Sequence, residues 1–532
     1  MSTKKLLSIT NLKKYFPVAK SSVFQRHQMY VRANEDITLD IYEGETLGIV
    51  GESGCGKSTL GRVILQLYPQ TAGSTVYYGT TLEDMVPSYA LDTLRRLDTY
   101  KKKLEKATAK RHSLEQKVDA VGEDNADFFL IQDRNLARCD EKSALDHIVK
   151  VTGGFFVKDE NGKGVALLQQ LLRQCQKRNG LRMQRNQQVR KQIACEGKEN
   201  QVNKLDAAIA EIDKKIAAWE TQIEKTRSEL DALRQKLSSD AEFAKYEALR
   251  DDGIDLSRLK YNEMRKLRKD LQIIFQDPYS SLNPRFTIGQ IIEEGLRTHG
   301  VHDENRETIR QHIVDTMKKC GLQEYMMHRY PHQFSGGQRQ RVAIARALAV
   351  DPKFVVCDEC VSALDVSIQS QIINLLMELK EKEKLTYLFI SHDLSVVRYI
   401  SDRICVMYLG NVVELADAAT IFSDPRHPYT VALLSSIPTT DPNSAEKERI
   451  LLEGNIPSPI KPPSGCKFRT RCYMACEKCE RVPPPLREIE PGHVVACHFP
   501  EKKLGPNGEY LFEVKKTQHK RGPAATGENA EV

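Results

Sequence analysis

The sequence predicts an α/β fold that is split by a long helical insertion and followed by a small cysteine-rich domain. Apolar strand-like runs alternate with helical patterns near the N-terminus and again after about residue 256, and a glycine-rich loop follows one of these strands. The stretch between them is charged, helical and poor in proline, whereas the end of the chain is rich in proline and cysteine. The expected segments are an α/β domain in two parts (1–84 and 256–423), an inserted helical arm (85–255), a C-terminal domain (424–500) and a disordered tail (501–532).

Composition and charge restrict the class of protein. The chain has 532 residues, of which 40% are hydrophobic and 28% charged, so it is long enough for several globular domains. Its net charge is only +7 and basic residues are interspersed with acidic ones, which argues against a nucleic-acid-binding protein. Because neither an apolar run of about 18 residues nor a signal peptide is apparent, we expect a cytosolic protein that meets a membrane only through partners. In that compartment the 13 cysteines are expected to be free thiols or metal ligands.

The inserted segment carries a seam of apolar residues spaced alternately by three and four. The seam extends over about five heptads and predicts a coiled coil of roughly 54 Å. A weaker stripe runs through residues 94–118, so we expect an antiparallel hairpin with residues 122–197 at its tip and a turn at 153–164 within that tip. The alternative is a stripe that packs on the domain's own surface. The seam, which only the threonine interrupts, consists of Val202, Leu205, Ile209, Ile212, Ile216, Trp219, Ile223, Thr226, Leu230, Leu233 and Leu237.

The glycine-rich loop indicates a specific chemistry. It fits the pattern G-x-x-x-x-G-K-[ST] between an apolar strand and a helix. Glycines let backbone N–H groups surround an anion, and the helix N-terminus adds a favourable dipole. We expect Lys57 to reach the β- and γ-phosphates and the Ser58 hydroxyl to bind Mg²⁺, although the loop by itself indicates only a nucleoside triphosphatase. The loop consists of Gly51, Glu52, Ser53, Gly54, Cys55, Gly56, Lys57 and Ser58.

Two acids that end an apolar strand are candidate catalytic residues. They are Asp358 and Glu359. We expect the strand to deliver Asp358 beside the phosphate loop, where its carboxylate can hold Mg²⁺ through water. Glu359 can polarise the attacking water, and a positioned base of this kind contributes about 10²–10⁴ in rate. An exposed strand end is the usual alternative for such a pair, but the phosphate loop in the same chain favours the catalytic interpretation.

A run of small residues before a helical pattern narrows the class of nucleoside triphosphatase. Ser335, Gly336, Gly337 and Gln338 resemble the signature of ATP-binding-cassette (ABC) ATPases. Small residues at a helix N-terminus can approach a phosphate closely. The resemblance implies an ABC-type P-loop fold with a helical signature subdomain. It also implies a head-to-tail dimer, in which the signature of one subunit faces the γ-phosphate held by the other.

Further residues resemble ABC motifs in the order that this family has them. Gln276 resembles the Q-loop glutamine, which senses Mg²⁺ and contacts the membrane subunit. Asp365 lies in a run that resembles the D-loop, and His392 resembles the switch histidine near the γ-phosphate. The resemblance thus implies that Lys57, Gln276, Glu359 and His392 are catalytic. Thr59, next to the phosphate loop, is expected to join the nucleotide contacts.

Two further positions concern the nucleotide base and a departure from the family. An aromatic platform for adenine is implied near the N-terminus, and we expect Tyr15, or otherwise Phe16, with core packing as the alternative for either ring. Cys360 stands where the family usually has proline after the acidic pair. Because Glu359 is intact, we expect a local backbone effect rather than a loss of chemistry.

Several longer runs resemble one branch of the ABC family, the ATPases of oligopeptide and dipeptide permeases. Residues 59–62 are more similar to the second of the two ATP-binding subunits than to the first. The arm has no counterpart in the usual family member. The runs that carry the resemblance are residues 275–285, 329–348, 361–369 and 425–430.

This resemblance implies an ATPase at the cytoplasmic face of the membrane that powers import of oligopeptides or dipeptides, with nickel or glutathione as alternative substrates. The implied partners are a second ATP-binding subunit, two integral membrane permease subunits and, indirectly, an extracellular substrate-binding protein. For the inserted arm we hypothesise docking onto the partner ATPase, the membrane subunits or an unidentified cytosolic protein.

A cysteine cluster near the C-terminus is a candidate metal site. Cys466, Cys472, Cys479 and Cys497 can together bind Zn²⁺ or a [4Fe–4S] cluster, and the spacing does not choose between them. Cys476 could replace Cys479 as a ligand. The surrounding sequence resembles the tail of peptide-permease ATPases and implies the iron–sulfur cluster, with zinc and no metal as alternatives.

Non-transport ABC proteins are the rival interpretations. DNA-repair and chromosome-maintenance ABC ATPases also carry coiled coils, but theirs follow the Q-loop glutamine, whereas the insertion here ends before Gln276. Translation and resistance ABC proteins carry two cassettes, and this chain has one phosphate loop and one signature. A regulatory assembly protein that uses the arm as its working part is a third alternative, which only the arm supports.

Overall fold

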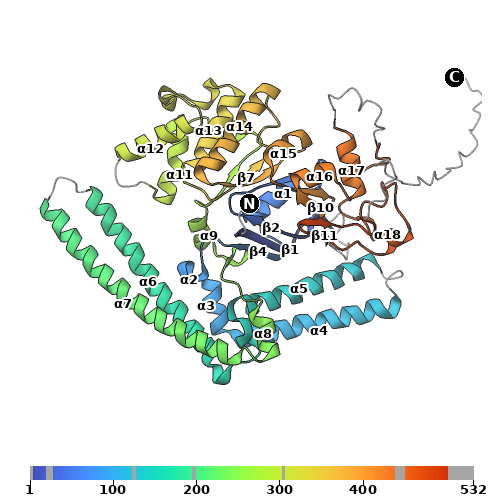
Figure 1. Ribbon diagram of the computed structural model, residues 1–532, viewed down its shortest axis with the longest axis horizontal. Helices are drawn as coiled ribbons and strands as arrows, with labels where there is room; N and C mark the ends of the chain where they lie inside the picture. Colours follow the sequence, from blue (N-terminus) through green and yellow to red (C-terminus); the bar gives the residue numbers. More distant parts are fainter. Residues whose placement is uncertain are drawn as a thin grey trace, which may run out of the picture.

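The computed structural model describes residues 4–19, 28–122, 127–194, 199–301, 306–437 and 450–500. The tail that the sequence predicts to be disordered, residues 501–532, lies outside the described residues. Two sheets form the centre of the molecule, a group of helices covers one side, and two long helical hairpins extend on the other (Figure 1). No described helix combines the length and apolar character that crossing a membrane requires.

The larger sheet has the strand order β11-β12-β10-β9-β3-β8-β7-β6. Strands β9, β3, β8, β7 and β6 are parallel to one another, and β3, β7 and β8 are buried along their whole length, as expected where both faces of a sheet are covered. The carboxyl ends of these strands therefore meet at one edge. The strands are β3 (Thr46–Val50), β6 (Leu271–Ile274), β7 (Phe354–Asp358), β8 (Thr386–Ile390), β9 (Arg403–Tyr408), β10 (Asn411–Asp417), β11 (Arg487–Glu490) and β12 (His493–Val495).

The smaller sheet is antiparallel and has the order β2-β1-β4-β5. Apolar side chains of β1 and β2 share one core with β3 and with helix α1, which starts directly after the phosphate loop. Its elements and α1 are β1 (Lys5–Pro17), β2 (Tyr30–Tyr42), β4 (Ala72–Tyr77), β5 (Ile254–Asp255) and α1 (Lys57–Ile64).

A helical layer covers the larger sheet on the side opposite the hairpins (Figure 1). Its apolar faces join β7 and β8 in the largest buried cluster of the described chain. Side-chain capping stabilises the N-termini of two of these helices, because Thr287 and Ser335 form capping boxes at α11 and α13. The helices are α10 (Pro278–Ser281), α11 (Ile288–His299), α12 (Arg306–Lys319), α13 (Gly336–Leu348), α14 (Val366–Glu383) and α15 (Leu394–Ile400). Helix α9 (Tyr261–Leu267) lies outside this layer, because its buried Met264 and Leu267 belong to the core shared with the smaller sheet.

The inserted segment forms two antiparallel hairpins that diverge from a common base (Figure 1). In the first, α4 pairs with α5 through the ion pairs Arg138–Glu115 and Lys110–Asp140. In the second, α6 pairs with α7 through Arg182–Glu220 and Arg185–Asp213. The helices are α2 (Leu82–Met85), α3 (Ser88–Arg95), α4 (Leu97–Val121), α5 (Phe128–Thr152), α6 (Lys163–Ala194), α7 (Glu199–Leu237) and α8 (Ala241–Glu247).

The expectation of a single hairpin with residues 122–197 at its tip is wrong. The seam from Val202 to Leu237 packs on α6, and the weaker stripe within residues 94–118 packs on α5, because each long helix finds its partner next in sequence. Thr226, the interruption of the seam, is buried with its hydroxyl donating to Gln222 O at 3.0 Å. The turn expected at the tip lies at the base instead, where the Phe155 ring meets Phe243 of α8 edge-on at 5.4 Å.

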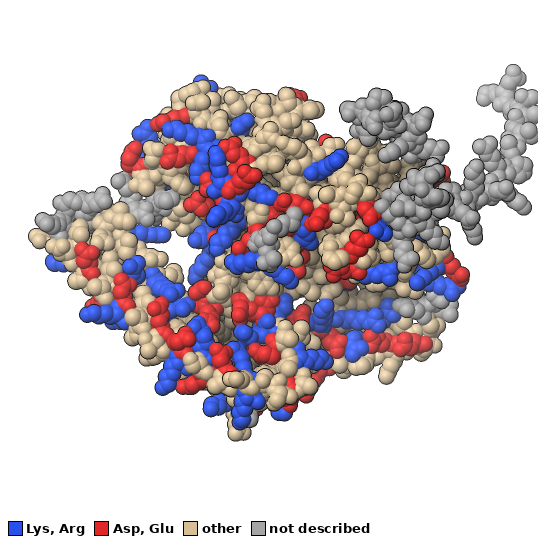
Figure 2. Space-filling model, in the orientation of Figure 1, with Lys and Arg blue, Asp and Glu red and all other residues tan. Residues whose placement is uncertain are grey.

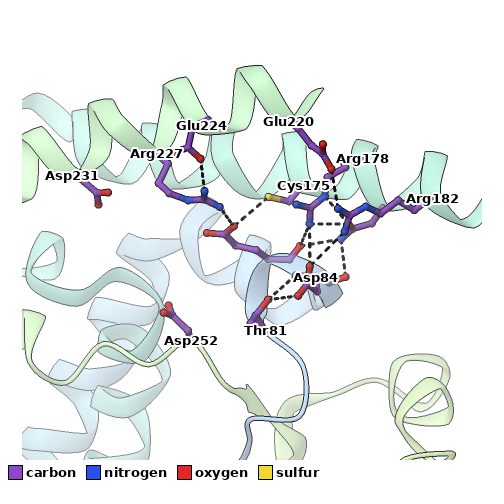
Figure 3. A network of polar contacts seen from close by, with 12 residues as sticks. Thr81, Asp84, Cys175, Arg178, Arg182, Glu220, Glu224, Arg227, Asp231 and Asp252 are labelled. Atoms are coloured by element: carbon purple, nitrogen blue, oxygen red, sulfur yellow. Dashed lines mark hydrogen bonds and ion pairs between the residues drawn. The ribbon is translucent and has the colours of Figure 1, made fainter. Parts of the chain in front are cut away.

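Polar contacts tie the second hairpin to the short helix α2 (Figure 3). Arg227 of α7 pairs with Glu83 at 2.7 Å, and Arg178 of α6 donates to Asp84 at 3.2 Å. A cavity of about 360 Å³ lies beside these contacts, between α2, α6 and α7. The outer part of α6 also reaches the helical layer, where Arg190 donates to Gly300 O at 2.7 Å. On the face shown in Figure 2, basic and acidic side chains alternate over both hairpins.

The C-terminal region, which the sequence predicts as a small domain at 424–500, extends the larger sheet of the α/β core. Strand β12 pairs with β10, so β11 and β12 extend the larger sheet at its edge. The Phe468 ring contacts Tyr408 of β9 and Tyr429 of α17 (Pro428–Ser435) at 5.2 and 5.3 Å between ring centroids. An aromatic cluster thus fixes the cysteine-bearing segment against the α/β core.

Candidate nucleotide-binding site

The phosphate loop joins β3 to α1 and requires glycine at defined positions. Gly51, Gly54 and Gly56 have φ values of 152°, 80° and 100°. A Cβ atom at Gly51 would lie 2.2 Å from Met407 O, and one at Gly56 would lie 2.1 Å from Ala33 O. Because only glycine fits there, the loop curls and directs its backbone N–H groups toward the start of α1, as an anion site requires.

Lys57 is the buried cation of this loop. Lys57 is only 4% exposed, and its Nζ donates to Gly51 O at 2.8 Å and Glu52 O at 3.1 Å. A cation held inside a loop of N–H groups is suited to a phosphate. Ser58 follows on α1 and is half-buried.

Asp358 ends β7, and one strand separates β7 from the phosphate-loop strand β3. Strand β8 lies between β3 and β7, because a crossover separates the two motifs in the sheet. Arg62 of α1 bridges the gap, with Nη2 3.2 Å from Asp358 Oδ2. Asp358 is fully buried, and its Oδ1 has no hydrogen-bond partner among the described residues. A buried carboxylate oxygen of this kind fits a hydrated Mg²⁺.

Three predicted catalytic residues meet at the carboxyl ends of β6, β7 and β8. Gln276 Nε2 donates to Glu359 Oε2 at 2.9 Å, and His392 Nδ1 lies 3.6 Å from the same oxygen. Glu359 has a φ of 49°, a conformation that non-glycine residues seldom adopt, and its N–H donates to Ile390 O at 3.0 Å. Strained backbone held by its surroundings is typical of functional sites.

The signature residues lie at the N-terminus of α13 and are exposed. Ser335 and Gly336 face solvent, and a Cβ on Gly337 would come within 2.5 Å of Ile368 Cγ2. Gln338 N donates to the Ser335 hydroxyl at 3.3 Å and closes the capping box. Figure 1 shows α13 in the helical layer, apart from α1. Within one chain the signature and the phosphate loop are thus separate surfaces.

The D-loop-like run connects the acidic pair to α14. The Ser362 hydroxyl donates to Glu359 O at 2.9 Å, and Asp365 is the residue before the first turn of α14. Val366 follows with 78% of its surface exposed. Cys360, in place of proline, is buried beside Cys357.

The structure does not support Tyr15 as the adenine platform. Tyr15 is 8% exposed and its hydroxyl donates to Glu35, and burial together with this carboxylate raises the pKa of the phenol. Phe16 is half-buried, with the Lys14 Nζ 4.6 Å from its ring centroid and Tyr68 edge-on at 5.7 Å. The register of β1 shifts on either side of Lys14, so simple alternation could not tell which ring points inward.

The predicted cysteine ligands are brought to one place. Cys466, Cys472, Cys479 and Cys497 line a common pocket together with Phe468. Burial raises the pKa of Cys472 to about 12 and that of Cys497 to about 11, so a metal would have to displace their protons. Their donor set fits a tetrahedral thiolate site, although within the described ranges no group of three or more potential ligands is close enough to hold an ion.

Cys476 differs from the other four cysteines. Cys476 is exposed and is absent from the residues that line this pocket, while its Sγ lies 3.7 Å from that of Cys479. The geometry therefore favours Cys479 over Cys476 as the third ligand.

The sequence reading missed two arginines that act on the site. Arg62 contacts Asp358, and Arg471 forms two hydrogen bonds to Glu52 of the phosphate loop, at 2.7 and 3.0 Å. Glu52 and Arg471 are 419 residues apart, so no local pattern could have paired them. The spacing of Arg62 one turn after Ser58 on α1 was a usable signal, because it places the side chain on the sheet-facing side.

The fold and the site together define an ATPase of the ABC class, since a phosphate loop, an acidic pair, a glutamine, a histidine and a capped signature helix occur on one α/β core. The family model "ABC transporter" matches residues 34–251 and 243–362, and "Oligopeptide/dipeptide transporter, C-terminal region" matches residues 413–479. The chain belongs to the oligopeptide/dipeptide branch of the ABC transporter ATP-binding proteins.

Curated relatives agree with this assignment. The putative oligopeptide transport ATP-binding protein YkfD of Bacillus subtilis is 53% identical over 249 residues, which are 46% of this chain and 75% of YkfD. The oligopeptide transport ATP-binding protein OppF of Salmonella typhimurium is 52% identical over 247 residues, 46% of this chain and 73% of OppF. The aligned part thus makes up less than half of this chain.

Proposed function

We propose that this chain binds and hydrolyses ATP to power the import of oligopeptides or dipeptides through a membrane transporter. The observation that carries the proposal is the meeting of Gln276, Glu359 and His392 at the sheet edge that also bears the phosphate loop. It occurs in a chain whose C-terminal region matches the oligopeptide/dipeptide transporter model.

Each residue at this edge has a distinct task. Lys57 and the loop N–H groups bind the phosphates, and Ser58 with Asp358 and Gln276 would hold Mg²⁺, which supplies charge neutralisation. The hydrogen bond from Gln276 orients Glu359, which accepts a proton from the attacking water. His392 lies beside the Glu359 carboxylate and would contact the γ-phosphate. Phe16, whose ring is less buried than that of Tyr15, is the better platform for adenine.

The ATP site is completed by a second ATP-binding subunit. Ser335 and Gly336 are exposed at a helix N-terminus but lie apart from the phosphate loop of their own chain (Figure 1). The γ-phosphate of a bound ATP would therefore be reached by the signature of a neighbouring molecule. A head-to-tail heterodimer with a related ATPase supplies that arrangement.

Contact with two membrane permease subunits is supported by aromatic side chains around the Q-loop and signature. Tyr279 directly follows the Q-loop and is 67% exposed, and Tyr325 is 59% exposed. Phe286 and Tyr330 are also exposed. This surface supports a position at the cytoplasmic face of the membrane, where an extracellular binding protein would supply the peptide through the membrane subunits.

Reconstitution tests the proposal. Liposomes are prepared with this chain, its partner ATPase, the two membrane subunits and the binding protein. ATP-dependent uptake of a labelled oligopeptide is then measured. We expect co-purification with the membrane subunits and uptake that stops without ATP. Uptake of nickel or glutathione in place of peptide would reject the peptide assignment, and a chain that never associates with membrane subunits would reject the importer.

Within the inserted arm (85–255), the two hairpins and their base, residues 90–250, form a docking element for a protein partner. The second hairpin connects α2 near the smaller sheet to Gly300 in the helical layer, so it is positioned to respond to both. The same liposomes prepared with a short linker in place of these residues provide the test. Loss of assembly or uptake supports the arm as a docking element, whereas unchanged assembly and uptake would exclude a required role.

The four pocket cysteines hold a [4Fe–4S] cluster. Their common pocket and the match of the surrounding region to the transporter tail model support it, and zinc is the alternative. Anaerobic purification should give about four iron and four sulfide per chain. Cys479→Ser should lower the iron content, whereas Cys476→Ser, the matched control, should leave it unchanged. One zinc per chain and no visible absorption would contradict the cluster.

A further inference from the structure

The cysteine-bearing segment touches the phosphate loop directly. Arg471 Nη1 donates to Glu52 Oε2 at 2.7 Å, and Nη2 donates to Glu52 Oε1 at 3.0 Å. The backbone N–H of Glu52 in turn donates to the Tyr429 hydroxyl at 2.9 Å. Two groups of the C-terminal region thus hold the second residue of the loop, one through its side chain and the other through its backbone.

The surroundings hold Arg471 in one position. Its side chain is 7% exposed, and its backbone N–H donates to Phe468 O at 3.0 Å in a turn between Cys466 and Cys472. Phe468 is itself buried against the Tyr408 and Tyr429 rings. A guanidinium fixed in this way can form a planar, two-bond pair with a carboxylate without losing much further side-chain entropy.

The charge of Glu52 explains why the loop needs this partner. Glu52 is a carboxylate in a loop that must receive the highly negative triphosphate, and like charges at such short range repel. Lys57 is occupied with the carbonyl oxygens of Gly51 and Glu52, so it does not neutralise the Glu52 side chain. Arg471 does so, and the bonds to Glu52 raise the pKa of the guanidinium further above its ordinary value, so the pair stays charged.

We propose that Arg471 is a positioning residue for ATP binding: it neutralises Glu52 and holds the phosphate loop open for the triphosphate. The C-terminal segment thereby sets the nucleotide affinity of a loop that is 419 residues away in sequence. This inference rests on the proposed function only in that the loop binds ATP.

The test is the dissociation constant for MgATP, measured by equilibrium dialysis of the full-length chain. Arg471→Met should weaken binding about tenfold, the effect of about 1.4 kcal/mol. The double variant Glu52→Gln with Arg471→Met should recover most of this loss, because it removes the carboxylate that is left unpaired. The deficit of the single variant should also shrink at high salt, where charge repulsion is screened.

Arg469→Met is the matched control. Arg469 lies two residues away in the same segment, but its guanidinium contacts Ser464 and Glu480 within that segment instead of the phosphate loop. We expect its affinity to stay within about twofold of the wild type. Arg471→Lys, which keeps the charge but not the two-bond geometry, should lie between wild type and Arg471→Met, and it covers the case in which Arg471→Met does not fold.

Two results would overturn the inference. One is an Arg471→Met protein, folded by circular dichroism, that binds MgATP as tightly as the wild type. The other is a double variant as weak as the single one at all salt concentrations, since a merely structural role predicts no recovery. If the wild type itself bound no ATP, the proposed function would fail instead, so the two failures are distinguishable.

Discussion

Glu359→Gln is expected to abolish ATP turnover while leaving ATP binding intact. The glutamine keeps the size of the side chain and can still accept a hydrogen bond from Gln276, but it cannot take a proton from water. Loss of a positioned general base lowers the rate by about 10²–10⁴. Because bound ATP would no longer be cleaved, we expect the ATP-bound dimer to accumulate, with the signature of each subunit facing the other's nucleotide.

Single-turnover hydrolysis and size-exclusion chromatography in the presence of MgATP measure these two effects. The measurement uses this chain together with its partner ATPase, so that each site is complete. Glu378→Gln provides a control, since Glu378 is exposed on α14 and pairs only with Lys382 of the same helix. Unchanged ATP turnover in Glu359→Gln would show that Glu359 is not the general base for the attacking water.

Lys57→Met should remove most of the affinity for ATP. Lys57 is the only cation that the described structure shows inside the phosphate loop, and its Nζ already makes two hydrogen bonds there, which phosphate oxygens would replace. Hydrogen bonds to charged groups contribute about 1.5–3 kcal/mol each. We therefore expect affinity to fall about 100-fold, which corresponds to about 2.7 kcal/mol.

Binding of a fluorescent ATP analogue at constant Mg²⁺ measures this loss. Lys382→Met is the matched control, because Lys382 is exposed and far along α14 from the loop. The thermal unfolding temperature without nucleotide should change little, since Lys57 bonds only to carbonyl groups of its own loop. Retained affinity in Lys57→Met would contradict a phosphate-binding role for this loop.

The convergence of the candidate catalytic residues was predictable because of a property of parallel sheets. Each motif follows an apolar strand, and the carboxyl ends of parallel strands meet at one edge. Gln276, Glu359 and His392 do meet there, after β6, β7 and β8. The strand order was not predictable in the same way, and neither was the contact of Arg62, on the helix after the phosphate loop, with Asp358.

The helix pairing in the inserted arm could not be predicted from hydrophobic periodicity. A seam such as Val202 to Leu237 indicates that a helix buries one face, but it does not indicate which other helix packs against that face. The covering helix, α6, has an apolar face of its own, with Leu168, Leu171 and Leu172 buried. Likewise Tyr15 and Phe16 are equivalent in sequence, and an irregular register in β1 decided which ring is inward.

By itself the sequence determined the phosphate loop, the acidic pair, the signature and the family, because these depend on residues that are adjacent in the chain and on backbone conformations that only certain residues adopt. The tertiary structure alone decided which helices pair in the arm, that Cys479 rather than Cys476 lines the cysteine pocket and that Arg471 reaches Glu52. Such contacts join residues far apart in sequence, and they depend on how whole elements pack, which no local pattern encodes.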